Sequence, residues 1–199
     1  MKTQVFSLIK TLAQVALSLT LLLTVSCNNK VSNEKQTKTK KEVSETAPKP
    51  PAMDIHTAAF MGNAKAIHQH INAKSDLNQK DQYGSTPLLI ACTFGKTEVA
   101  KALIEGGADL TVKNNDGSNA LHVAAFFCRI EIVKALLAKN VDKTVKNNYG
   151  STALESIKIP FSHVKPVYDQ ISKDLGSMGL KLDYKYLETT RPKIAELLQ

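Results

Sequence analysis

The sequence predicts an all-α solenoid of about four helix-turn-helix repeats that ends in a divergent C-terminal cap. One short phrase, a glycine turn followed by an apolar run, occurs three times, at residues 83–88, 116–121 and 149–154. Its glycines stand at positions 84, 117 and 150, so the spacing is 117 − 84 = 33 and 150 − 117 = 33. A fixed period of this size is typical of stacked repeats, because each unit can bury its apolar face only against a neighbour.

The two complete repeats are predicted at residues 81–113 and 114–146. In each of them a turn leads into a first helix, a bend and a second helix. Thr86 suits an N-cap because its oxygen can accept a hydrogen bond from an unpaired backbone N–H, and Pro87 suits the first turn because it has no N–H to satisfy. Apolar residues such as Leu103 then recur on one face, which stacking would bury.

These repeats resemble the ankyrin repeat. Its Thr-Pro-Leu-His-x-Ala phrase is nearly complete at residues 119–124, Asn-Ala-Leu-His-Val-Ala, and partial at residues 86–91, Thr-Pro-Leu-Leu-Ile-Ala. The resemblance implies a helical solenoid that binds proteins. It also implies that His56 and His122, which share one repeat column, bond the backbone between neighbouring turns.

Less regular repeats flank the complete ones. Residues 53–80 fit the same register one step earlier and are predicted to be the opening repeat. Residues 147–175 begin as a fourth copy, and residues 176–199 are predicted to be a capping extension over the open end of the stack.

Two prolines interrupt the last repeat. The second helix is therefore expected to begin near Pro166, and a last helix to begin near Thr190 and Pro192. Apolar and polar residues also alternate over residues 180–186, so a short strand is an alternative for that segment.

The first 26 residues are predicted to be a signal peptide of the lipoprotein type. A positively charged start is followed by an apolar run over residues 12–25, which is shorter than a membrane span. Cys27 closes this run in a pattern that resembles the lipobox of bacterial lipoproteins, although Thr24 stands where that family usually has leucine. The resemblance implies a lipid anchor at Cys27 and, because Asn28 follows instead of aspartate, a place on the outer membrane of the cell envelope. The alternative is cleavage at small residues, which would release a soluble periplasmic or secreted protein.

Residues 27–52 form a predicted tether. They contain many lysines and prolines but almost no apolar side chain, and so they cannot bury enough surface to offset the entropy of ordering. The formal charge of the whole chain is +8, or 26 − 2 − 18 = +6 without Lys2 and Lys10. This balance suggests an alternative function, that of an envelope structural protein that associates with anionic lipid or cell-wall polymer.

The motifs argue against an enzyme. The sequence has no glycine-rich phosphate loop, no His-Glu-x-x-His and no Gly-x-Ser-x-Gly, and its histidines and cysteines lack metal-ligand spacing. We therefore expect no cofactor and no metal, and we expect a monomer that binds a protein and no nucleic acid. Cys92 and Cys128 fall in different columns of adjacent repeats and are expected to be free, buried thiols.

The predicted partner surface consists of positions that the scaffold does not need. In ankyrin proteins the turn tips and the end of the first helix face the concave groove, and partners dock there. Four of the six phenylalanines fall in two adjacent columns of this groove, which favours recognition; the alternative is that half of these rings seal the seam between repeats. The positions carried over are Phe60, Met61, Gln82, Tyr83, Thr93, Phe94, Asn115, Asp116, Phe126, Phe127, Asn148, Tyr149 and Ile159.

Overall fold

A computed structural model describes residues 49–199, and within this range the chain is entirely helical, with nine helices and no strand. The predicted signal peptide and most of the predicted tether lie outside the described residues. No helix within residues 49–199 combines the length and the apolar character needed to cross a bilayer. The helices are α2 (Ile55–Met61), α3 (Ala64–Asn72), α4 (Pro87–Phe94), α5 (Thr97–Glu105), α6 (Ala120–Phe126), α7 (Ile130–Leu137), α8 (Ala153–Lys158), α9 (Phe161–Gly176) and α10 (Tyr184–Leu198).

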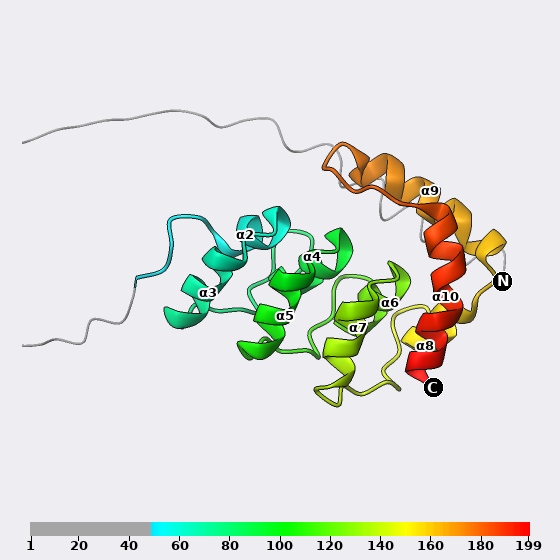
Figure 1. Cartoon of the computed structure of the whole chain (residues 1–199), viewed down its shortest axis with the longest axis horizontal. Helices are drawn as coiled ribbons and strands as arrows, with labels where there is room; N and C mark the ends of the chain where they lie inside the picture. The colour runs from blue at the N-terminus through cyan, green and yellow to red at the C-terminus, as the bar shows by residue number, and fades with distance from the viewer. Residues whose placement is uncertain (1–48) are drawn as a thin grey trace, which may run out of the picture.

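The helices form two layers that run along a solenoid (Figure 1). We call α2, α4, α6 and α8 the first helices, and each packs against the next along one layer. The second helices α3, α5 and α7 pack in the same order along the other layer. This arrangement confirms the predicted helical solenoid of stacked repeats.

The repeat period places equivalent side chains in one continuous core. Leu103 and Leu136, which are one period apart, are fully buried, and so are Val99 and Ile132 in the neighbouring column. No single helical pair could bury this face alone, and so the contacts between repeats supply most of the burial.

Local sequence explains where the first helices begin. The Thr86 hydroxyl accepts from the Leu89 N–H at 3.3 Å, with proline in the first turn, as predicted. Thr152 forms a full capping box, in which its hydroxyl accepts from the Glu155 N–H at 3.1 Å and the Glu155 carboxylate accepts from the Thr152 N–H at 2.7 Å. Each cap satisfies backbone donors that a helix start leaves unpaired.

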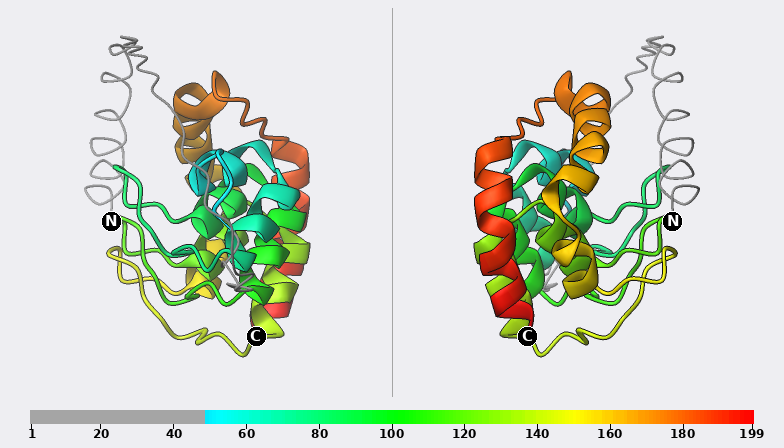
Figure 2. Two further views of the ribbon diagram at one scale, coloured as in Figure 1. Left: turned by 90° about the vertical axis from the view of Figure 1, so that its left-hand side faces the viewer. Right: turned by 90° about the vertical axis from the view of Figure 1, so that its right-hand side faces the viewer.

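The loops before α4, α6 and α8 project side by side from the helical layers (Figure 2). Each is closed by a side-chain oxygen that accepts two backbone N–H groups; Asp81 does this for Tyr83 and Ser85, both at 2.8 Å. Asn114 and Asn147 take the same role in the next two loops. The glycine of each loop has φ between 72° and 75°, the left-handed region that favours glycine, which explains its recurrence at every period.

The C-terminal region departs from the predicted boundaries. Helix α9 begins at Phe161 and contains Pro166, and α10 begins at Tyr184, where the Asp183 carboxylate accepts from the Tyr186 N–H at 3.0 Å. The expectation of a late start for both helices was therefore wrong, and residues 180–186 form no strand. The N–H that Pro166 lacks would have bonded to the carbonyl of Ser162, an exposed residue whose carbonyl can be hydrated instead.

Helix α10, and not α9, completes the fourth repeat. It packs against α8 and α7, where the second helix of a fourth repeat is expected (Figure 1). Helix α9 is thereby an insertion between the two helices of this repeat, and its Tyr168 reaches the C-terminal end of α6 at Phe126 (α9 is orange in Figure 2). This rearrangement decides which part of the predicted partner surface stays accessible.

Candidate binding surface

Repeat 1 (residues 53–80) and repeat 2 (residues 81–113) present an aromatic pair at the ends of their first helices. The rings of Phe60, on α2, and Phe94, on α4, meet edge to face with centroids 4.8 Å apart. Both rings are only partly buried, and the neighbouring Met61 is 62% exposed. These three side chains, which we call the open cluster, were all predicted from the sequence. Thr93, also predicted, donates its hydroxyl to the Leu89 carbonyl of its own helix at 3.0 Å.

Repeat 3 (residues 114–146) has a second aromatic pair, in which Phe127 is buried and Phe126 is partly buried. The rings of Phe126 and Phe127 also meet edge to face, with centroids 5.2 Å apart. Phe127 is only 6% exposed, and the Arg129 guanidinium lies 5.8 Å from its ring centroid. A partner cannot reach this ring, which corrects the prediction that Phe127 belongs to the binding surface.

Helix α9 provides the cover through Tyr168. This side chain is fully buried, its ring centroid lies 4.6 Å from that of Phe126, and its hydroxyl donates to the Phe126 carbonyl at 2.6 Å. Burial raises the pKa of Tyr168 well above its ordinary value, so the hydroxyl remains a donor at all physiological pH values. Ile159, another predicted contact, remains 42% exposed at the end of α8.

A buried arginine ties α9 and α10 to α8. Arg191, which is 4% exposed, donates to the Tyr168 hydroxyl at 3.0 Å and to the carbonyls of Ser156 and Ile159 at 3.1 and 2.7 Å. The guanidinium thus satisfies carbonyl groups that the end of α8 leaves free. Neither Arg191 nor Tyr168 was predicted, because their partners lie 23 to 42 residues away in sequence.

Side chains later in the sequence also donate hydrogen bonds to carbonyl groups at the C-terminal ends of α4 and α6. Arg129 donates to the carbonyls of Cys92 at 3.4 Å and Thr93 at 2.9 Å, and burial lowers the pKa of its guanidinium. The Tyr186 hydroxyl donates to the Cys128 carbonyl at 3.2 Å, just beyond α6. At the end of α2, within residues 49–199, no side chain donates to the carbonyl of Phe60.

The predicted turn-tip residues are engaged with one another. The Asn148 side chain donates to the Asn115 carbonyl at 3.0 Å, and its backbone N–H donates to the Asp116 carbonyl at 2.9 Å. The Tyr149 hydroxyl donates to the Asp116 carboxylate at 3.1 Å; burial, followed by the nearby carboxylate, raises the pKa of Tyr149 to about 12. These residues therefore connect two loops, whereas Gln82 is exposed and Tyr83 half-buried on the preceding loop.

A lysine ladder runs along the same loops. The Lys80 ammonium donates to the Lys113 carbonyl at 2.7 Å, and the Lys113 ammonium donates to the Lys146 carbonyl at 3.0 Å. Each lysine thus binds the backbone one period further on. The sequence displays the lysine column, but its hydrogen-bonding role was not predicted.

The histidines act as predicted from the ankyrin resemblance. The His122 ring contacts the Ser151 carbonyl through Nε2 at 3.1 Å, and the His56 ring contacts the Gln79 carbonyl at 2.8 Å. Burial lowers the pKa of His122, an effect that its bond to the carbonyl opposes. Both side chains link a first helix to backbone outside it and so belong to the scaffold.

Comparison with known proteins agrees with this geometry. Residues 55–147 match the family of ankyrin repeats, in three copies. This segment consists of ankyrin repeats. Protein phosphatase 1 regulatory subunit 27 is 36% identical over 53 residues in Homo sapiens and 38% identical over 53 residues in Mus musculus. The match covers 27% of this chain and 34% of each relative, so the chain spans about a third of the length of these relatives.

The ankyrin repeats make this part of the chain a protein–protein interaction module, on a fold that is not itself catalytic. Within residues 49–199, no group of three or more His, Cys, Asp or Glu side chains could hold a metal ion. Cys92 and Cys128 are free and buried, and burial raises the pKa of the first thiol to about 12 and that of the second to about 11. Such thiols are unreactive and act as small core side chains.

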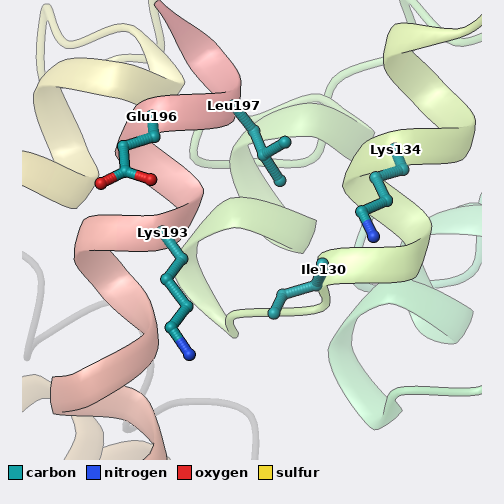
Figure 3. A pocket seen from close by; sticks show the side chains of 5 residues that line it. All are labelled: Ile130, Lys134, Lys193, Glu196 and Leu197. Carbon is teal, nitrogen blue, oxygen red and sulfur yellow. The ribbon is translucent and has the colours of Figure 1, made fainter.

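A separate cleft lies where α10 joins the ankyrin repeats. It has a volume of about 500 Å³ and lies between α7 and α10 (Figure 3). Ile130 and Leu197 supply its apolar lining, and the rest comes from Lys134, Lys193 and Glu196. Lys134 pairs with Glu131 at 2.9 Å.

Proposed function

We propose that this protein binds a protein partner through the open cluster of Phe60, Met61 and Phe94. The observation that carries the proposal is the contrast between the two aromatic pairs. In repeat 3 the Phe127 ring is buried and the chain's own α9 stacks Tyr168 on the partly buried Phe126, whereas no helix of residues 49–199 stacks on Phe60, and its pair with Phe94 lies beside a methionine that is 62% exposed. Large apolar side chains that remain exposed beside a fully packed core are typical of an interaction site.

The chemistry of the open cluster suits protein recognition. Aromatic rings and methionine contribute much of the binding energy at interfaces, because they remove a large apolar area from water. Methionine also adapts its shape to a partner. The printed name of the two relatives, a regulatory subunit, describes proteins that assemble with another protein, which agrees with a binding role.

Substitution of Met61 tests the place of binding. We expect Met61→Asp to lower the affinity for the partner at least about tenfold, because a carboxylate would be buried without a counter-charge. The partner is captured from envelope extract with the wild-type chain, identified, and then titrated against each variant. Phe94→Ser is expected to give a similar loss.

The matched control is Met178→Asp. Met178 is 50% exposed on the turn after α9 and is not part of the first helices. This variant should bind the partner as the wild type does, and all three variants should keep the wild-type helical circular dichroism. Unchanged affinity in both Met61→Asp and Phe94→Ser would refute the proposed surface.

We further propose that the module is displayed in a bacterial cell envelope, anchored by lipid at Cys27. Support comes from the sequence, in which a charged and apolar leader ends at this cysteine and a lysine- and proline-rich tether follows. The several acyl chains of a mature lipoprotein bind a bilayer stably, whereas a single chain does not.

Cys27→Ser is expected to move the protein from the membrane fraction to the soluble fraction. Metabolic labelling with an alkyne-bearing fatty acid should mark the wild-type chain and leave the variant unmarked. Cys92→Ser serves as the control, because that thiol is buried in the fold. Labelling of the Cys27→Ser chain would contradict the proposed anchor.

A further inference from the structure

The chain's own α9 demonstrates how a helix docks on the end of a first helix. Its residues Val164, Val167, Tyr168 and Ile171 are all buried and are spaced i, i+3, i+4 and i+7, which is one face of a helix. Tyr168 stacks on Phe126 and bonds to the carbonyl of the same residue. An apolar stripe with a single tyrosine thus supplies the contacts of α9 with Phe126, and Arg191 further fixes the tyrosine hydroxyl.

The open cluster contains the residue equivalent to Phe126, on which Tyr168 of α9 stacks. Phe60 stands two periods before Phe126, since 126 − 60 = 66, and Phe94 stands one period before Phe127, since 127 − 94 = 33. The two pairs have similar edge-to-face geometry, with interplanar angles of 85° and 88°. The pairs differ in register, because Phe60 and Phe94 belong to adjacent repeats whereas Phe126 and Phe127 are consecutive residues. What the open cluster shares with repeat 3 is the Phe126 position, which Phe60 takes on α2, and no helix from residues 49–199 stacks on Phe60.

The backbone carbonyl that accepts the Tyr168 hydroxyl also has equivalents in the earlier repeats, at Thr93 and Phe60. The Phe126 carbonyl accepts the Tyr168 hydroxyl, whereas in the intervening repeat the Thr93 carbonyl is occupied by Arg129 at 2.9 Å. The Phe60 carbonyl accepts from no side chain of residues 49–199. Of these three equivalent positions, only the one on α2 therefore combines an accessible ring with an acceptor that a hydroxyl group could use.

We infer that the partner binds the open cluster with an amphipathic helix that carries a tyrosine on its apolar face. The ring of this tyrosine stacks on Phe60, its hydroxyl donates to the Phe60 carbonyl, and neighbouring apolar residues cover Phe94 and Met61. This inference rests on the proposed function and names the class of partner.

A synthetic peptide of residues 160–178, fluorescently labelled and with blocked ends, is the probe. Titrated with the full chain, it is expected to bind, and its Tyr168→Ala form should bind at least about tenfold more weakly. A Tyr168→Phe peptide should fall between the two, because it keeps the ring and loses only the hydrogen bond.

Variants of the full chain locate the bound peptide. Met61→Asp and Phe60→Ala should each weaken peptide binding at least about tenfold, whereas Met178→Asp should leave it unchanged. Peptide binding that is unchanged in both Met61→Asp and Phe60→Ala would overturn the inference. The peptide would then be replacing α9 at Phe126 or associating with a second copy of the chain. Equal binding of the Tyr168→Ala peptide, or no binding at all, would also overturn it. If the captured partner still depends on Met61 in that case, the proposed function stands and only the helical partner class fails.

Discussion

Replacing Tyr168 with alanine is expected to lower the free energy of unfolding by about 4 kcal/mol. The side chain is fully buried, so its removal loses the contact with the Phe126 ring and leaves a cavity. It also leaves the Phe126 carbonyl without its donor and removes the acceptor for Arg191. No other residue of α9 combines ring packing and hydrogen bonding in this way, and so α9 should lose its fixed position.

Tyr168→Phe separates the two contributions. It keeps the ring against Phe126 and removes only the hydroxyl, for which we expect a loss of about 1 to 2 kcal/mol. Both values can be measured by urea unfolding monitored by circular dichroism, with the wild type as reference. A Tyr168→Ala chain within about 1 kcal/mol of the wild type would contradict the role of Tyr168 in fixing α9.

Gly117→Ala is expected to cost about 3 kcal/mol of stability, in contrast to about 1 kcal/mol for Gly150→Ala. Both glycines have nearly the same positive φ, 72° and 75°, so the backbone strain of an alanine is similar at the two sites. Only at Gly117 would the new Cβ meet the next loop: it would clash with the Asn148 side-chain oxygen and come within 2.8 Å of the Asn148 backbone nitrogen. The hydrogen bonds from Asn148 to the Asn115 and Asp116 carbonyls would then be lost.

The pair is informative because Gly150 has open space around it. Thermal or urea unfolding gives the free energy of unfolding of each variant. The difference between the two values measures the contribution of loop stacking, because the backbone strain of the alanine is similar at both sites and cancels. Gly84→Ala should lose an intermediate amount, because its Cβ would meet only the side chain of Asn115 in the following loop, which can move, and no backbone atom. Equal losses at Gly117 and Gly150 would mean that the loops do not stack.

Much of the fold could be predicted because its rules are local and repeated. Thr86 and Pro87 mark a helix start through chemistry that operates within one turn. Gly84 and its equivalents mark turns because their φ values are positive. The 33-residue period then places Leu103 beside Leu136 without any knowledge of distant contacts.

The C-terminal region could not be predicted in the same way. Pro166 usually signals a helix boundary, but here the helix continues through it. The exchange of roles between α9 and α10 depends on Arg191 and Tyr168, whose partners are far away in sequence. The predicted start near Pro166 left Val164 out of the apolar face of α9, and nothing in the sequence states which surface that face covers.

The candidate site was also predicted only in part, because the exposure of a side chain depends on contacts that are distant in sequence. Phe60, Met61 and Phe94 lie in the predicted columns and stay accessible, because no element within residues 49–199 covers them. Phe127 lies in the same column as Phe94, yet it is buried. The period determines a residue's column, whereas exposure depends on what the rest of the chain places over it.

Site-specific photocrosslinking tests the central claim most directly. The photoreactive residue p-benzoylphenylalanine is introduced at Met61, in the open cluster, or at Glu98, which is exposed on the second helix α5 of repeat 2. Each full-length chain is irradiated in intact cells. The proposed binding surface predicts a crosslink from position 61 to one protein partner and none from position 98. A crosslink to that partner from position 98, with none from position 61, would contradict it.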